Sequence, residues 1–321
     1  MAARRPAVSV VMTAFNRERY VAHAIESVLS QTFGDFELII VDDCSTDATV
    51  DVARGYETDP RVRVIVNEKN LGDYPNRNHA ASFATAEFLK YHDSDDLMYP
   101  HCLATMHASL AAEPRAAFAL SGACSWSGGP SPMLLTARQC YEREFLGTGM
   151  FDRGPSNALF RTEAFRKAGG FSLAGAASDY VFWLRVCAHV NVLLVPADLH
   201  WYRRHPGQEI SSEHAFRDYA AAHNVAWMML NSPECPLTGE VLECAKANFV
   251  FTVARKIYWE LFGGRPRQAW RIFRTAGFQR GDWIRFLRRR PPDPVAGTPV
   301  DSRGDPIVAQ AQSIDAIARA T

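Results

Sequence analysis

The chain has 321 residues, of which 47% are hydrophobic and 22% are charged, a composition typical of a globular protein with one large domain or two smaller ones. Its 35 basic residues balance 35 acidic residues, so no overall field favours nucleic acid. Seven scattered cysteines indicate reduced thiols, and no apolar run approaches the roughly 20 residues that span a bilayer. We therefore expect a cytoplasmic protein, either soluble or peripheral at the inner face of the membrane.

The first hundred residues alternate between short β-branched runs and helical patterns. The runs are apolar enough to be strands buried on both faces, and they lie at 8–12, 36–41, 62–66 and 87–90. Helical spacing of apolar residues follows at 20–29 and again at 77–83. This alternation predicts an α/β fold with a doubly wound, mostly parallel sheet. Polar residues gather after each strand, at what would be one edge of that sheet.

The most informative of these polar runs is Asp93-Ser94-Asp95-Asp96, which follows the fourth strand. Carboxylates packed this closely raise each other's pKa unless a cation lies among them. Oxygen ligands suit Mg²⁺ or Mn²⁺, which proteins usually share with a substrate phosphate. The loop after a strand is also where open α/β sheets bind ligands. Two hypotheses follow: a divalent metal that holds a diphosphate, or a solvated acidic turn.

The middle of the chain alternates less regularly. The segment 122–154 loses periodicity and is rich in Gly, Ser and Pro, which predicts a binding loop or disorder. Within it, Trp126 is expected either to stack on a sugar or to cover the loop's own core. Around this segment we expect a helix at 100–112, strands at 116–121 and 155–160, helices at 162–167 and 178–186, and strands at 191–195 and 199–203.

The composition changes from Glu213, where three helices are predicted at 215–230, 237–261 and 266–273. Nine arginines lie between residues 265 and 290, interleaved with aromatic residues and opposed by one acid, Asp282. Such a stretch is expected either to lie on an anionic membrane or partner, or to be a solvated helix face. We expect three regions: a main domain at 1–212, a helical region at 213–290 that is basic at its end, and a flexible tail at 291–321.

Several motifs in the first half occur in an order that resembles the family 2 glycosyltransferases, inverting enzymes with the GT-A fold. The motifs that carry the resemblance lie at 8–16, 27–32, 36–47, 70–72, 77–78 and 93–96, and it returns at 157–171 and 179–185. The resemblance implies a GT-A fold, with a mostly parallel central sheet flanked by helices, followed here by a helical C-terminal extension.

The resemblance also implies roles for individual residues. The catalytic base is Asp179, which takes the acceptor proton; the preceding Ser178 stands where members usually carry Glu. The nucleotide and its ribose are expected to contact Thr13, Phe15, Asn16, Asp42, Asp43, Arg77, Asp93 and Ser94. A Mn²⁺ or Mg²⁺ ion is expected near Asp95, Asp96 and His205; the direct ligand among the three aspartates is left open. A loop that closes over the diphosphate would contain Arg203 and Arg204.

We therefore expect a metal-dependent, non-processive transferase that moves a sugar from a nucleotide-sugar to an acceptor. The donor is expected to be a UDP-sugar, by family frequency, and the acceptor a glycan, a lipid-linked molecule or a small molecule. The expected process is cell-surface polysaccharide or glycoconjugate biosynthesis. The processive Q-x-x-R-W signature is absent. A sugar nucleotidyltransferase is the first alternative, but the loop 13–17 lacks the glycines that its phosphate loop needs. A non-catalytic module that binds a nucleotide-sugar or a partner is the second.

Overall fold

The structure, a computed structural model, describes residues 5–122, 132–147, 149–196, 199–205, 208 and 213–287. Trp126 and the predicted tail therefore lie outside the described residues. An eight-stranded sheet forms the centre, and its strands are, in spatial order, β3 (Val62–Val66), β2 (Phe36–Asp42), β1 (Val8–Ala14), β4 (Phe88–Asp93), β8 (Ala158–Arg161), β6 (Ala116–Gly122), β9 (Asn191–Pro196) and β7 (Met133–Leu135).

The sheet is mostly parallel, as predicted. Strands β3, β2, β1 and β4 run parallel to one another, β8 lies antiparallel between β4 and β6, and β7 pairs antiparallel with β9. Within the parallel half the register pairs Ala14 with Asp42 and Thr13 with Asp93. The polar residues that follow these strands therefore meet at one edge, which is the edge where such sheets bind ligands.

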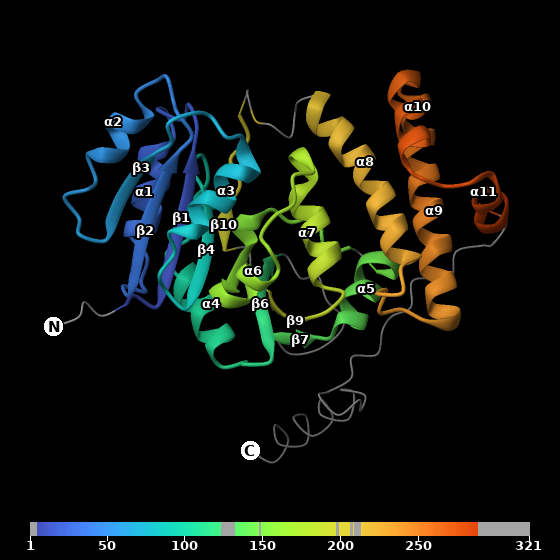
Figure 1. Ribbon diagram of the computed structural model, residues 1–321, viewed down its shortest axis with the longest axis horizontal. Helices are drawn as coiled ribbons and strands as arrows, with labels where there is room; N and C mark the ends of the chain where they lie inside the picture. The colour runs from blue at the N-terminus through green and yellow to red at the C-terminus, as the bar shows by residue number, and fades with distance from the viewer. Residues whose placement is uncertain are drawn as a thin grey trace, which may run out of the picture.

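Helices cover both faces of the sheet and extend beyond it (Figure 1). One hydrophobic core joins the sheet to α1 and α4, and the other joins it to α3, α5, α6, α7 and the C-terminal helices. The helices are α1 (Val21–Leu29), α2 (Thr49–Arg54), α3 (Asp73–Ser82), α4 (Cys102–Ala111), α5 (Ala137–Leu146), α6 (Thr162–Lys167), α7 (Ser178–Val186), α8 (Glu213–Leu230), α9 (Gly239–Phe262), α10 (Pro266–Thr275) and α11 (Arg280–Leu287).

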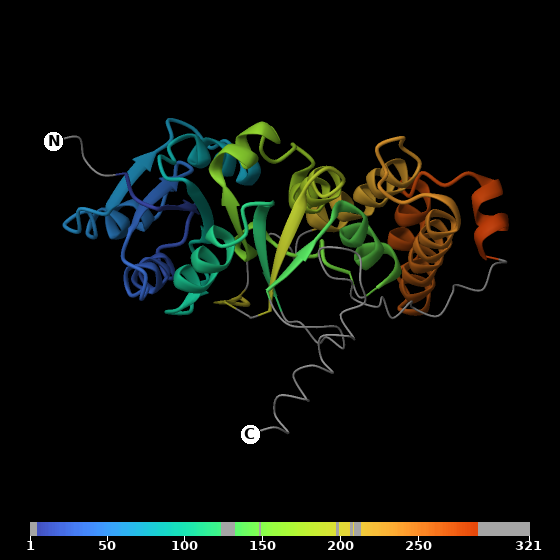
Figure 2. The ribbon, with the colours of Figure 1, turned by 90° about the horizontal axis from the view of Figure 1, so that it is seen from below.

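The C-terminal helices confirm the predicted helical extension and lie at the end of the molecule away from β3 (Figure 2). None of the helices in the described ranges is long and apolar enough to cross a membrane.

The prediction of an irregular segment at 122–154 was wrong for part of its length. Residues 133–135 form β7, and residues 137–146 form α5. Thr136 begins that helix with a capping box, in which its hydroxyl and the Gln139 side chain each satisfy the other's backbone N–H. Two predicted strands are also shorter: residues 155–157 form a 3₁₀ turn before β8, and only residues 200–201 of 199–203 form a strand, β10.

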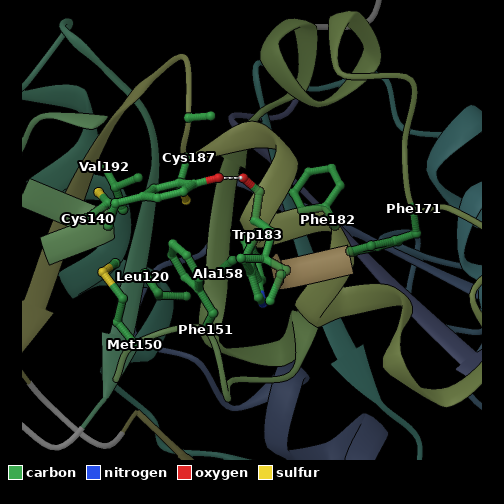
Figure 3. Packing of buried hydrophobic residues seen from close by; sticks show 14 of the residues in the cluster. Leu120, Cys140, Met150, Phe151, Ala158, Phe171, Phe182, Trp183, Cys187 and Val192 are labelled. Carbon is green, nitrogen blue, oxygen red and sulfur yellow. Dashed lines mark hydrogen bonds between the residues drawn. The ribbon is translucent and has the colours of Figure 1, made fainter. Parts of the chain in front are cut away.

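An aromatic cluster fills the core beneath α7 (Figure 3). Trp183 is fully buried, stacks on Phe160 with ring centroids 5.8 Å apart, and contacts Phe182 edge to face at 5.1 Å. Its indole N–H donates to the carbonyl of Arg153 at 2.7 Å, so its one polar atom is satisfied. This packing fixes α7, whose first turn carries Asp179.

We predict that Trp183→Ala lowers the free energy of unfolding by about 3–5 kcal/mol, because it leaves a cavity and an unpaired carbonyl. Urea unfolding followed by circular dichroism measures the loss. The matched control is Trp259→Ala on α9, where the side chain is exposed and the expected change stays within about 0.5 kcal/mol. Equal effects at the two positions would contradict this account of the core.

Candidate active site

The loops after β1 and β2 are joined by Asn16. Its backbone has a φ of 51°, a left-handed conformation that asparagine tolerates better than most residues. Its N–H donates to the Ser45 hydroxyl at 2.8 Å, and its side-chain oxygen accepts from the N–H of Thr46 at 2.8 Å. The neighbouring Phe15 ring is left 42% exposed at this edge, and Thr13 lies one residue before the end of β1.

Asp42 and Asp43, both predicted to lie at the nucleotide, are buried and bonded to the protein's own loops. Asp42 accepts from the N–H and the hydroxyl of Ser45, at 2.7 and 2.5 Å. Asp43 accepts from the N–H groups of Leu71 and Gly72, each at 2.8 Å. Asp43 therefore ties the loop after β2 to the start of α3, and together the two carboxylates shape this part of the edge.

Arg77, on α3, lies between two carboxylates, and its side chain is only 11% exposed. Its Nε contacts Asp73 at 2.8 Å and one terminal nitrogen contacts Asp93 at 2.7 Å. Burial opposes its charge, but Asp73 and Asp93 outweigh burial and hold the pKa of Arg77 well above its usual value. The remaining nitrogen, Nη1, is buried and has no hydrogen-bond partner within the described part of the chain. A substrate oxygen would satisfy it.

Asp93 ends β4 and is fully engaged by neighbouring groups. Besides Arg77, it accepts from the Ser156 hydroxyl at 2.6 Å. Ser156 is itself held in place, because its carbonyl accepts from the buried Lys90 ammonium. Burial raises the pKa of Asp93, but Arg77 and Ser156 outweigh burial and lower that pKa to about 2. Asp93 is therefore ionised at neutral pH, and Ser94 beside it is buried.

The loop after β10 (His200–Trp201) folds back over the acidic run. The Oδ2 atom of Asp95 lies 2.9 Å from Arg17 Nε and 3.0 Å from His205 Nε2. The N–H of Arg203 donates to Asp96 at 2.9 Å, and its guanidinium donates to the Asp95 carbonyl at 2.8 Å. The predicted residues Asp95, Asp96, Arg203 and His205 therefore come together. Arg204, in contrast, points to solvent and lies exposed.

Asp96 is the least satisfied carboxylate of the run. It is buried, and its Oδ2 atom has no hydrogen-bond partner among the described residues. Burial and the nearby charge of Asp93 raise the pKa of Asp96 to about 8. A cation beside Oδ2 would favour the ionised carboxylate, because it would offset both the burial and the repulsion from Asp93.

These observations test whether the site suits a divalent metal. The described residues contain no group of three His, Cys, Asp or Glu side chains already arranged around a metal. In this conformation the Asp95 carboxylate already contacts Arg17 and His205. The donor types nevertheless fit Mn²⁺ or Mg²⁺, since Asp95 and Asp96 offer carboxylate oxygens and Asp96 Oδ2 is an orphaned buried atom.

Asp179 lies in the first turn of α7, close to Arg77. It is buried and accepts from the N–H of Tyr180 at 2.7 Å. Burial raises the pKa of Asp179 to about 7, although the Tyr180 N–H, the charge of Arg77 and the Tyr74 hydroxyl each lower it. A carboxylate with a pKa near neutrality is suited to accept a proton.

The loop before Asp179 is fixed from two sides. Ser178 donates its hydroxyl to the Gly175 carbonyl at 2.7 Å and accepts from the N–H of Ala174 at 3.0 Å. Asp218 of α8 accepts from the N–H of Ala176 at 3.0 Å. Gly175 has a φ of 62°, and an added Cβ would lie 2.0 Å from the Asp218 carboxylate. The C-terminal helices therefore support the loop that presents Asp179.

Sequence reasoning did not select five residues that now support the site. Asp73 could have been found, because it lies four residues before Arg77 on one helix, the spacing of an ion pair. No local signal pointed to the others, since their partners are distant in sequence: Arg17, Tyr74, Ser156 and Asp218. A cavity of about 390 Å³ at the far end of α7, lined largely by Phe and Ala side chains, contains none of the predicted site residues.

Comparisons with known proteins agree with this fold. The sequence model of Glycosyl transferase family 2 matches residues 9–169, half of the chain. The chain therefore belongs to glycosyl transferase family 2, as the resemblance predicted.

Relatives match over a shorter stretch. EpsE of Bacillus subtilis (strain 168), described as a putative glycosyltransferase, is 41% identical over 100 residues, which are 30% of this chain and 36% of EpsE. WfgD of Escherichia coli, described as a UDP-Glc:alpha-D-GlcNAc-diphosphoundecaprenol beta-1,3-glucosyltransferase, is 36% identical over 90 residues, 28% of this chain and 35% of WfgD. The matched part thus spans about a third of these relatives.

Solved structures share the fold over more of the chain. TarS 1-349 of S. aureus, in complex with UDP-GlcNAc, has a TM-score of 0.59 at 22% identity, covering 76% of this chain and 71% of TarS. The mannosyltransferase PcManGT of Pyrobaculum calidifontis, in complex with GDP-Man and Mn²⁺, has a TM-score of 0.56 at 17% identity, covering 85% and 88%. These similarities confirm the GT-A fold.

We predict that Asp218→Ala frees the loop before Asp179. Hydrogen exchange of the Ala176 N–H should accelerate, and the free energy of unfolding should fall by about 1 kcal/mol, because a part-buried donor loses its acceptor. Hydrogen exchange with mass spectrometry measures the local effect. Asp218→Asn, which can still present an oxygen, should restore most of the protection. Unchanged exchange in the alanine variant would show that Asp218 does not hold the loop.

Proposed function

We propose that this chain is an inverting glycosyltransferase that moves a sugar from a UDP-sugar to an acceptor hydroxyl, with Asp179 as the base. The single observation that carries the proposal is the position of Asp179: its carboxylate, with a pKa of about 7, lies near Arg77, which binds Asp93 at the nucleotide edge. The donor domain is assigned to residues 1–212. UDP is favoured because WfgD is named for UDP-Glc and TarS was solved with UDP-GlcNAc. GDP is the alternative, because PcManGT was solved with GDP-Man.

In the proposed reaction the carboxylate of Asp179 takes the proton of the acceptor hydroxyl while the hydroxyl oxygen attacks the anomeric carbon. The bond from that carbon to the diphosphate oxygen breaks, the nucleoside diphosphate leaves, and the configuration at the anomeric carbon inverts. In this proposal the buried Nη1 of Arg77 donates a hydrogen bond to an oxygen of the nucleotide-sugar. Arg203 and Arg204 lie on the loop that is proposed to contact the diphosphate.

A divalent ion, held by Asp95 and Asp96 with His205 as a further candidate, would neutralise charge on the departing diphosphate when bound. The acceptor is proposed to be a glycan or a lipid-linked sugar in cell-surface polysaccharide biosynthesis, supported by the diphosphoundecaprenol in the name of WfgD.

The two alternatives are less consistent with the site. A nucleotidyltransferase needs a glycine-rich phosphate loop after β1, whereas the loop here is held by side chains of Asn16 and Ser45. A module that only binds nucleotide-sugar has no need for a buried carboxylate with a pKa near 7.

We predict an acidic limb in the pH dependence of kcat/KM. Only ionised Asp179 accepts a proton, and its pKa is raised above the ordinary aspartate value, so activity is present above this pKa and is lost as the pH falls through it. The midpoint is expected near pH 7, with about a tenfold fall for each further pH unit. Initial-rate kinetics with a saturating sugar donor and a varied acceptor measure kcat/KM for the acceptor at each pH.

Asp179→Asn is the matching variant and should lower transfer by at least about 100-fold while nucleotide binding stays nearly unchanged. Asp51→Asn, an exposed position on α2, is the control and should behave as wild type. If Asp179→Asn turned over at the wild-type rate, or if the acidic limb of kcat/KM in the native chain had its midpoint near pH 4, Asp179 would not be the catalytic base.

We predict metal-dependent binding of one nucleoside diphosphate. Calorimetric titration with UDP, GDP and dTDP, each with and without Mn²⁺, should show UDP binding that strengthens with the metal. Asp95→Ala should weaken the metal-dependent part at least about tenfold. Unchanged UDP affinity of this variant with Mn²⁺ present would remove Asp95 from the metal role. Failure of all three nucleotides to bind would favour the non-catalytic alternative.

A further inference from the structure

The turn between α9 and α10 exposes an unusual group of apolar side chains. We call the segment 258–270 the hairpin tip. Five of its apolar side chains are more than half exposed, namely Tyr258 (58%), Trp259 (55%), Leu261 (54%), Phe262 (74%) and Trp270 (59%). Single exposed apolar residues are common, but a contiguous group marks an interaction surface.

The helical positions explain why these side chains face outward. The buried face of α9 carries Phe249, Val250 and Val253, and it packs in the core shared with α8. Tyr258 and Phe262 are four residues apart, so they share a face on the other side of the helix. Their rings stack with centroids 6.2 Å apart, and Trp259 contacts Phe262 at 5.8 Å. Three aromatic rings of the tip therefore pack against one another at the surface, whereas Trp270 stacks on Phe273 with ring centroids 5.6 Å apart.

The charges around the tip are positive. Arg265 pairs with Glu260 at 2.5 Å, which neutralises the one acid of the tip. Arg267, in the first turn of α10, and Arg274, two turns along the same face, are exposed and make no ion pair with any described residue. Arginine side chains beside exposed Trp, Tyr and Phe match the boundary between lipid headgroups and acyl chains.

We propose that the hairpin tip docks this protein onto the surface of an anionic lipid bilayer. The aromatic side chains and Leu261 enter the headgroup–acyl boundary, and Arg267 and Arg274 contact lipid phosphates. A second copy of the chain is a poorer occupant, because a twofold interface brings the same patch of each copy together and would oppose the unpaired arginines.

The hairpin tip is linked to the candidate active site through one helix. Arg271 of α10 contacts Glu213 of α8 at 3.3 Å, and the Thr275 hydroxyl donates to the Ala220 carbonyl at 3.0 Å. Asp218 of the same helix holds the loop before Asp179. Figure 1 shows the tip and the start of α8 at the same end of the molecule. Docking through the tip would therefore hold the edge that carries Asp179 near the membrane.

Vesicle sedimentation of the intact chain tests this proposal without requiring catalysis. The probes are vesicles of phosphatidylcholine alone and vesicles of equal parts phosphatidylcholine and phosphatidylglycerol. The native chain should sediment with the second kind only, and less so as the salt concentration rises. The double variant Trp259→Ser/Phe262→Ser should bind at least about tenfold more weakly, because it loses two aromatic side chains that the proposal places in the bilayer. Arg267→Glu should also reduce binding.

The matched control is Met228→Ser, which removes an apolar side chain that is 62% exposed on α8 and should leave vesicle binding unchanged. Urea unfolding midpoints within the error of the native chain confirm that the variants fold. No binding to phosphatidylglycerol vesicles, equal binding to both kinds, or binding unaffected by the tip variants would overturn the proposal. So would a native dimer in light scattering that the double variant converts to a monomer.

Discussion

The site depends on the ion pairs of Arg77 with Asp73 and Asp93. These pairs tie α3 to the end of β4 and place one cation among carboxylates that would otherwise repel one another. Its charge also lowers the pKa of Asp179, which burial alone would raise further. The three side chains are only partly exposed, so removing one partner leaves its opposite charge poorly solvated and destabilises this edge. The architecture of the edge therefore rests on this guanidinium, while its free Nη1 remains for a ligand.

The neighbouring carboxylates are driven to opposite protonation states by their surroundings. Arg77 and Ser156 lower the pKa of Asp93 to about 2, whereas burial and that same ionised Asp93 raise the pKa of Asp96 to about 8. Groups whose pKa values are pushed apart in this way commonly divide the roles of a site. Here Asp93 is ionised and paired with Arg77, whereas Asp96 carries a buried Oδ2 atom without a hydrogen-bond partner in the described part of the chain.

The sequence predicted the parallel half of the sheet well, because β-branched runs such as the one that forms β1 show their period directly. It also placed the candidate nucleotide and metal residues at one edge, since parallel strands end together. It missed α5, whose capping box at Thr136 and Gln139 was present but lay in a stretch without clear periodicity. It could not find Ser156 or Asp218, because their roles come from contacts 63 and 42 residues away that only the folded chain creates.

The two halves of the site differ in how they are held. The candidate nucleotide edge lies largely within residues 9–169, where the family model matches. Asp179 lies beyond that range, and the loop before it is held by Ser178 and by Asp218 from α8. A carboxylate's reactivity depends on how firmly its backbone is positioned. In this protein, Asp218 of α8 supplies part of that support, so a change in the packing of α8 would alter the loop before Asp179 sooner than the candidate nucleotide edge.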